Sequence, residues 1–409
     1  MLWIFVAGMI AVHAFFLWRV RAGIERGDPD FTVFYTAGRM LRLGLGAHLY
    51  DPRAEQTVQA EFAKNFDVRR GPLPYIHPPF EALVFLPLTY FPYSRAFVLW
   101  DLLNLGMLFG VGYLLRRWLP GLQRASVMEW VLLSLAFFPV FANFHQGQDA
   151  ILLLLVLTLS FQSLGRDADF LAGSWLGMGV FKYHLILPLA LILAVWRGKK
   201  LLAGFGLVAL ADVVISCLLV GWRGVLQYPE YAWRVVSMPA LGGIPMRQQP
   251  NLLGVLGGWV SFRGPGWLLP VVVGGFSVAL TIVVVKLRPV VVEKQSLKLG
   301  LACAVITALL VGYSTNSYDL SLLIVPLAVT LDYNFGDGAS PARRRLGLLV
   351  PAIPLLVSPV WFFLWMRFQR INLMGLFLLW WVYAIRAELL RLKQSGSILR
   401  ADARRKVHA

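Results

Sequence analysis

Apolar runs long enough to cross a membrane recur from one end of the chain to the other. A helix needs about 20 mainly apolar residues to span the hydrocarbon core of a bilayer. The runs lack the alternation of about ten residues that marks the strands of a membrane barrel, the other structure that satisfies its backbone groups in lipid. The pattern therefore predicts an all-α polytopic membrane protein, with spans near residues 1–20, 95–115, 127–142, 150–165, 201–221, 267–287, 297–313, 319–333, 346–366 and 371–385.

Two further segments are less regular. Residues 77–92 are short and rich in proline, and residues 170–196 form an apolar run that Phe181-Lys182-Tyr183-His184 interrupts. If the basic loops and the N-terminus share one side, residues 77–92 do not cross, and residues 170–196 enter the membrane and return as a helical hairpin. We expect about ten to twelve transmembrane helices, the number depending on whether residues 77–92 cross.

Composition supports the membrane interpretation and explains the charge. The chain has 409 residues, of which 58% are hydrophobic and 14% charged, and its mean hydropathy is +0.68. Soluble domains are about a quarter charged. The net charge of +17 would suggest nucleic-acid binding in a soluble protein. Here the basic residues gather between or after apolar runs, as cytoplasmic loops do under the positive-inside rule; the clusters are 197–200, 286–298, 343–345 and 386–406.

This topology predicts where the loops lie. Two long loops, residues 21–76 and 222–251, face outward, and a basic tail at 386–409 is cytoplasmic. Residues 31–45 suit an amphipathic helix that lies in the membrane interface. Residues 1–20 lack the basic start and small-residue cleavage site of a signal peptide, so we expect a retained first span. Since no repeat or linker divides the chain, we expect one membrane domain over residues 1–409.

Two carboxylates, Asp28 and Asp30, directly follow the first span. Acidic side chains beside a bilayer are costly unless they have a function or a solvated position. Asp28 precedes Pro29 and suits a turn. From the residues alone, Asp30 suits the N-cap of a helix that begins at Phe31, and its alternative role is a general base.

Lys182 is isolated in an apolar segment, with His184 two positions later. An ionisable residue at membrane depth indicates a functional site by default. The alternative is a lysine whose ammonium group snorkels to the interface. A polar cluster at residues 143–148 follows another span and suits either contacts to a polar ligand or a helix cap.

Several short motifs occur in order along the chain: Asp30-Phe31-x-x-Phe34-Tyr35-x-Ala37-Gly38-Arg39, Gly46-Ala47-His48-Leu49-Tyr50-Asp51, Tyr75-Ile76-His77-Pro78-Pro79-Phe80, Asn143-Phe144-His145-Gln146-Gly147-Gln148, Lys182, Arg247-Gln248-Gln249-Pro250-Asn251 and Tyr318-Asp319. Their order resembles that of glycosyltransferase family 87 of bacteria, and the resemblance covers nearly the whole chain. It implies a GT-C membrane enzyme that transfers mannose or a related sugar from a polyprenyl phosphate. Two departures concern the donor. Asn316 to Asp319 stand where the family often has His near Tyr, and the Asn-Gln pattern before residue 252 is rearranged.

The resemblance and the residue types together predict the roles of individual side chains. Asp30 is expected to be the general base, and the donor phosphate is expected to contact Lys182, His184, Arg39 and Arg247. Contacts to the sugar or the acceptor are expected from Asp28, Tyr35, His77, Asn143, His145, Gln146, Gln148, Gln249, Asn251, Tyr318 and Asp319. Arg39 also suits lipid headgroups, and Asp319 suits a helix cap. No metal or other cofactor is expected, because Asp28 and Asp30 alone supply too few ligands.

These features predict an inverting, metal-independent transferase on the outer face of the bacterial inner membrane. It would move a hexose, with mannose as the first expectation, from a polyprenyl-phosphate donor to a lipid or glycan acceptor. The chain has no Walker loop or dinucleotide fingerprint, which fits a donor other than a nucleotide-sugar. The alternative is a transporter or lipid flippase, since interrupted helices around a mid-membrane Lys182 also suit transport. A scaffold without activity is a third interpretation.

Overall fold

The computed structural model describes residues 1–63, 73–237, 246–260, 266–291, 294–336, 346–356 and 372–407. These residues form helices joined by loops and turns, and none of them forms a strand. The helices are α1 (Leu2–Arg26), α2 (Phe31–Arg42), α3 (Pro52–Ala60), α4 (Ala82–Phe85), α5 (Tyr93–Trp118), α6 (Val127–Leu135), α7 (Phe138–Gln146), α8 (Ala150–Gly165), α9 (Asp169–Met178), α10 (Tyr183–Arg197), α11 (Lys199–Ser237), α12 (Leu252–Val260), α13 (Leu268–Val285), α14 (Arg288–Val291), α15 (Lys294–Val311), α16 (Ile324–Phe335), α17 (Ile353–Leu356) and α19 (Leu373–Val407).

The predicted all-α polytopic membrane fold is confirmed. Six helical segments in the described part of the chain are long and apolar enough to cross a membrane; they lie within residues 2–42, 93–118, 180–197, 199–235, 268–291 and 373–394. Helices α6 and α7 are bent by 76° at their junction and would make a seventh span if they cross together. The spans expected near 150–165 and 297–313 are apolar helices of less than spanning length, and residues 357–366 of another expected span lie outside the described residues.

The two irregular segments are both interrupted in the structure. Residues 180–197 are long and apolar enough to cross a membrane by themselves, so the hairpin expected over 170–196 stays a prediction. Residues 77–92 contain only short helical pieces, namely the 3-10 turns η2 (Pro79–Glu81) and η3 (Leu86–Tyr90) on either side of α4. Their prolines prevent a long helix, because a proline in a helix interior removes a backbone donor and clashes with the preceding turn. The interruption at 181–184 falls at a 3-10 turn, η5 (Val180–Lys182), between α9 and α10.

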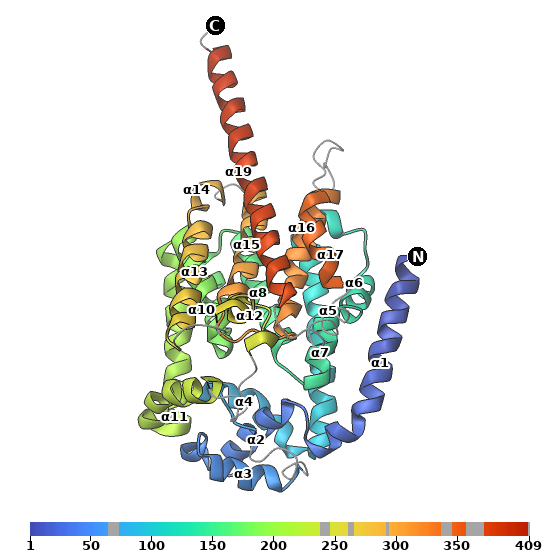
Figure 1. Cartoon of the computed structure of the whole chain (residues 1–409), viewed down its shortest axis with the longest axis vertical. Helices are drawn as coiled ribbons and strands as arrows, with labels where there is room; N and C mark the ends of the chain where they lie inside the picture. The colour runs from blue at the N-terminus through green and yellow to red at the C-terminus, as the bar shows by residue number, and fades with distance from the viewer. Residues whose placement is uncertain are drawn as a thin grey trace.

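Helices α2, α3 and α4 form a layer across one end of the helical bundle, hereafter the α2–α4 layer, while α19 extends beyond the opposite end (Figure 1). Helix α11 kinks at Gly221, whose φ of 76° lies in the left-handed region that favours glycine. The kink lets the last part of α11 run along the α2–α4 layer (Figure 1). This layer therefore packs on the bundle from one end.

Helix α2 is buried on nearly every side, where its sequence suggested a helix half immersed in the interface. Phe31, Phe34 and Tyr35 are at most 2% exposed and belong to an aromatic core within the α2–α4 layer. Gly38 permits the close packing, because a Cβ there would lie 2.9 Å from the backbone nitrogen of Leu86. The predicted apolar face of α2 is buried, and contacts with neighbouring elements bury most of its other residues as well.

Glu55 on α3 is fully buried in the same layer. Its Oε1 accepts a hydrogen bond from the backbone N–H of Tyr75 at 2.9 Å, and the Tyr231 hydroxyl lies 3.4 Å from its Oε2. Burial disfavours the charged carboxylate and raises the pKa of Glu55 to about 8, well above its ordinary value of 4.5. At neutral pH the folded protein therefore keeps a proton on this group.

We expect the thermal stability of the protein to fall as the pH rises from about 5 to 8. Between 4.5 and 8 the folded protein holds a proton on Glu55 that the unfolded chain has lost. The free energy of unfolding then decreases by up to about 1.4 kcal/mol per pH unit. The measurement is the melting temperature in detergent across this range, with Glu55→Gln expected to flatten the slope and Glu61→Gln, an exposed acid of the same layer, to leave it unchanged. An unaltered slope in Glu55→Gln would contradict the assignment.

Candidate active site

Asp30 lies where the α2–α4 layer meets the turn between α7 and α8. The backbone N–H of Asp30 donates to Gln146 Oε1 at 3.1 Å, and its carboxylate Oδ2 accepts from Gln148 Nε2 at 2.9 Å. Asp30 occupies the N-cap position of α2, but its side chain makes no capping hydrogen bond there. The carboxylate therefore bonds to a turn of the bundle and remains partly exposed.

Gly147 makes this contact possible. It ends α7 with a φ of 59°, and a Cβ at this position would lie 2.7 Å from the Cβ of Phe31. Only glycine combines the left-handed conformation with so close an approach. Its carbonyl also accepts a hydrogen bond from the Trp100 indole at 3.0 Å, which fixes the turn against α5.

The polar cluster at 143–148 divides into structural and exposed members. Asn143 is buried, and its Oδ1 accepts from the Ala150 N–H at 3.0 Å, so it caps the first turn of α8. His145 and Gln146 are only half-buried, and their side chains contact each other at 3.0 Å between Nδ1 and Nε2. Asn143 therefore fits the helix-cap interpretation of this cluster. His145 and Gln146 instead form a partly exposed polar surface.

Lys182 is buried close to the Asp30 site. Its ammonium lies 2.8 Å from Asp149 Oδ1 and 3.1 Å from Asp319 Oδ1, and its side chain is 3% exposed. It does not snorkel to an interface. Two carboxylates already share its charge, so a phosphate would have to compete with them.

Tyr318 lies near both the buried ion pairs and Asp30. Its ring centroid lies 5.0 Å from Lys182 Nζ, and its hydroxyl accepts a hydrogen bond from Asn316 Nδ2 at 2.7 Å. The Asn316 backbone N–H donates to Asp319 Oδ2 at 2.8 Å. Burial, together with the nearby carboxylates of Asp30 and Asp319, raises the pKa of Tyr318 well above its usual value. Tyr318 therefore stays a neutral hydroxyl next to several acidic groups.

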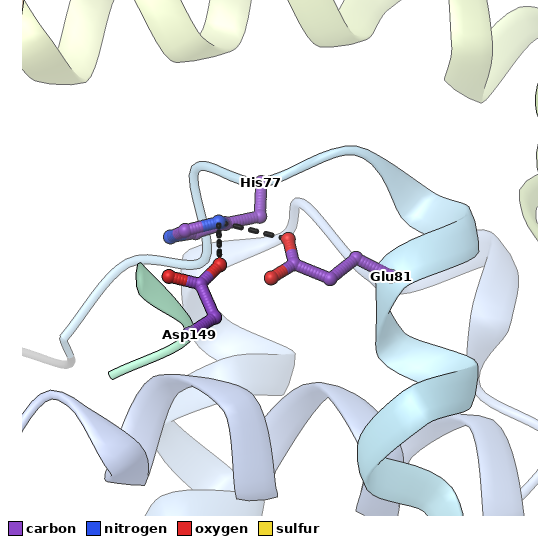
Figure 2. A group of neighbouring side chains, drawn as sticks. All are labelled: His77, Glu81 and Asp149. Carbon is purple, nitrogen blue, oxygen red and sulfur yellow. Dashed lines mark ion pairs between the residues drawn. The ribbon is translucent and has the colours of Figure 1, made fainter. Parts of the chain in front are cut away.

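Sequence reasoning missed two acidic members of this cluster, Glu81 and Asp149. His77 Nδ1 lies 2.8 Å from Glu81 Oε2 and 4.0 Å from Asp149 Oδ2, as Figure 2 shows. The His-x-x-x-Glu spacing of 77 and 81 was one available signal, and the position of Asp149 directly before an apolar helix was another. Both carboxylates are at most 1% exposed. A buried acid near a lysine in a membrane protein is a functional candidate, which makes these two comparable to Lys182.

Burial separates the protonation states of this cluster. It lowers the pKa of His77 to about 4, with Lys182 adding to the effect, so the imidazole is neutral at pH 7. Burial and the neighbouring Asp149 raise the pKa of Glu81 well above its usual value. Burial also opposes ionisation of Asp149, but Lys182, Glu81 and His77 together outweigh it and hold that pKa below its ordinary value.

The other predicted residues lie around this site or away from it. His184 is half-buried near the Tyr313 ring at 5.4 Å. Gln249 and Asn251 are buried, and Asn251 Nδ2 donates to the Gly312 carbonyl at 2.7 Å, next to the loop that carries Tyr318. The side chain of Arg247 lies outside the described residues.

Three predicted residues have structural partners elsewhere. Asp28 lies 3.4 Å from Arg26, the Tyr35 hydroxyl donates to the Phe91 carbonyl at 2.9 Å, and Arg39 forms an ion pair with Glu61. The structure thus brings Asp30, Gln146, Gln148, His77, Lys182, Tyr318 and Asp319 into one region.

The sequence comparison decides the family. A model of glycosyltransferase family 87 matches residues 75–312, which is more than half of the 409 residues. The chain belongs to glycosyltransferase family 87. The match contains His77, Gln148 and Lys182, whereas Asp30 and Asp319 lie outside it.

Two curated relatives of this family 87 protein carry the same name, polyprenol-phosphate-mannose-dependent alpha-(1-2)-phosphatidylinositol pentamannoside mannosyltransferase. The one from Mycobacterium tuberculosis (strain CDC 1551 / Oshkosh) is 31% identical over 87 residues, 20% of each chain. The one from Mycolicibacterium smegmatis (strain ATCC 700084 / mc(2)155) is 35% identical over 88 residues, 21% of each chain. The chain thus matches about a fifth of the length of these relatives. No solved structure matches the family 87 chain.

Proposed function

We propose that this family 87 protein transfers a hexose, mannose in the first instance, from a polyprenyl-phosphate donor to a lipid or glycan acceptor. Family membership and the names of the two partial relatives support a membrane mannosyltransferase with a lipid-linked donor. The fold supports the same class, because its apolar helices offer a long lipid chain a place beside a polar site.

The observation that carries the proposal is the position of Asp30. Its partly exposed carboxylate is held by Gln148 and its backbone by Gln146, so it has a defined direction without being buried. In the proposed reaction the acceptor hydroxyl attacks the anomeric carbon while Asp30 takes its proton. The bond from that carbon to the phosphate oxygen breaks, and the polyprenyl phosphate leaves with the electron pair. The configuration at the anomeric carbon is thereby inverted.

The donor phosphate would lie on the other side of the sugar from the acceptor. His184 is a candidate among the predicted phosphate contacts, because its ring is half-buried and its Nε2, which is itself buried, has no hydrogen-bond partner among the described residues. Lys182 is paired with Asp149 and Asp319, so it would contact a phosphate only in competition with these carboxylates. Arg39 and Arg247 remain further phosphate candidates, the first of them already paired with Glu61.

We further propose that the α2–α4 layer faces the outside of the bacterial inner membrane. Basic clusters lie at the opposite end of the bundle, where the ends of α10 and α13 meet through the Trp196 to Val285 hydrogen bond. The start of α15 and the end of α16 meet there through Lys298 and Asp332. Cytoplasmic loops collect lysine and arginine, so this end would be cytoplasmic and Asp30 would lie outside.

The proposal predicts that the purified protein in detergent consumes polyprenyl-phosphate mannose in the presence of a membrane lipid extract. The expected result is time-dependent transfer of label to a lipid or glycan product, with no turnover of a nucleotide-linked mannose. Detergent micelles have no compartments, so this turnover would also exclude a pure transporter or flippase. Absence of turnover with polyprenyl-phosphate mannose, glucose and galactose alike would overturn the proposal.

A further inference from the structure

Three electron-pair donors converge beside Lys182. His77 Nδ1, a Glu81 carboxylate oxygen and an Asp149 carboxylate oxygen all lie within 4.8 Å of one another, and they point toward a common position in Figure 2. A neutral imidazole protonated on Nε2 presents only a lone pair at Nδ1. Lone pairs gathered this closely repel one another unless a positive group lies between them.

The charges in this cluster do not balance. Among the described residues in mutual contact there are three carboxylates, on Glu81, Asp149 and Asp319, and one ammonium, on Lys182. With all three carboxylates ionised, two negative charges would be left over in a buried position, and either protons or a cation must neutralise them. Buried charges are normally paired or bound to a metal, because removing them from water is costly.

Hydrogen bonds do not account for these oxygens either. Glu81 is 1% exposed, and neither of its carboxylate oxygens accepts a hydrogen bond from the described residues. Asp149 uses Oδ1 for Lys182, while its Oδ2 is the atom that faces His77. Buried polar atoms without hydrogen bonds are rare and call for an explanation, such as an ion.

We propose that His77, Glu81 and Asp149 bind one divalent cation of the Mn²⁺ or Zn²⁺ class. The separations of 2.8 and 4.0 Å from His77 Nδ1 fit ligands that each lie about 2.0–2.2 Å from a single cation. One imidazole and two carboxylates suit these ions, whereas Mg²⁺ and Ca²⁺ prefer oxygen ligands alone. A charge of +2 would offset the two surplus negative charges.

The surroundings hold these three ligands in place. The His77 ring lies 4.8 Å from the Phe34 ring and 5.7 Å from the Tyr75 ring, which restricts its rotation. Lys182 fixes Asp149 through its other oxygen. Partners that orient metal ligands in this way raise metal affinity. The site concerns cation binding and goes beyond the proposed sugar transfer, so it can be tested without an activity assay.

The test measures bound metal in the full-length protein purified without a histidine tag. After loading with Mn²⁺ or Zn²⁺ and extensive dialysis, the wild-type protein should retain one cation per chain by elemental analysis. Bound Mn²⁺ should also give an immobilised electron paramagnetic resonance signal. Changes outside the ligand set already weaken binding by about 10–100-fold, so we expect Glu81→Gln to weaken it by more than about 100-fold.

The matched control is Glu55→Gln, the same substitution at another buried glutamate of the α2–α4 layer, which should retain the metal. His77→Gln provides a second ligand variant, and all variants are compared at equal monodispersity and melting temperature. Retention of metal by Glu81→Gln, or failure of the wild type to retain either ion, would overturn the proposal. An infrared band of a protonated carboxyl in metal-loaded protein that disappears in Glu81→Gln would also overturn it, because a proton would then fill the position.

Discussion

Replacing Asp30 with asparagine should lower the kcat of sugar transfer by about 10²–10⁴-fold, which is the usual contribution of a general base. Asparagine has nearly the same shape and can still accept the hydrogen bond from Gln148, so the turn at 146–148 should keep its geometry. It cannot take a proton from the acceptor hydroxyl. The loss should therefore appear in kcat at saturating donor, with little change in the melting temperature.

The control for this substitution is Glu25→Gln, which removes an exposed carboxylate near the end of α1. It should leave kcat within about a factor of two, since exposed substitutions away from special features have small effects. Near-normal transfer by a folded Asp30→Asn protein would show that Asp30 is not the base. A comparable loss in Glu25→Gln would instead indicate a general effect of charge at this surface.

Replacing Lys182 with methionine should destabilise the protein by about 3–5 kcal/mol, the usual cost of removing one partner of a buried ion pair. The substitution leaves the carboxylates of Asp149 and Asp319 buried without their shared ammonium. Fifteen tryptophans make intrinsic fluorescence a sensitive measure of unfolding in detergent. The expected result is a large fall in melting temperature, accompanied by loss of transfer.

Two further variants separate the buried charge from the loss of a lysine as such. Adding Asp319→Asn to Lys182→Met should restore part of the stability, because it removes one of the uncompensated charges. Lys298→Met breaks an ion pair with Asp332 whose lysine side chain is 26% exposed, and it should cost only about 1 kcal/mol or less. Equal destabilisation by Lys182→Met and Lys298→Met would contradict the role given to burial.

Hydropathy and proline content were sufficient to predict most of the helices. The first run is the helix Leu2–Arg26, and the prolines at 77–92 correspond to short helical turns. The predicted helix start at Phe31 is also confirmed, with Asp30 in the N-cap position. These features depend on local sequence, so a single chain contains the information needed to predict them.

The partners of the polar residues could not be predicted in the same way. Lys182 was noticed because it interrupts an apolar run, but nothing near it in sequence indicates that Asp149 and Asp319 bind it. Glu81 escaped notice because a glutamate in a loop is usually solvated, and only tertiary packing, with η2 against α11, buries it. Such pairs arise from tertiary contacts between distant segments, which no local pattern records.

Helix α2 illustrates the same limit for burial. Its apolar spacing identifies one face, and that face is buried as expected. The spacing contains no information about α3, α4 and η3, which pack against α2. Residues outside the predicted apolar face, such as Val33 and Met40, are buried as well. A helix predicted to rest half in the membrane interface is therefore a core element of the α2–α4 layer.

The two hydrogen bonds that hold Asp30 have a consequence for the order of folding. They join Asp30 to residues 116 and 118 positions later, so they close a very long loop. Such non-local contacts form late, because the entropy of loop closure is lost before the contact repays it. At about 5–20 residues per second of synthesis, Asp30 would leave the ribosome roughly 6–24 s before Gln148. A nascent chain that ends before α8 would hold its first membrane helices without a positioned carboxylate, so Asp30 takes its final place only after α7 and the turn that follows it have been made.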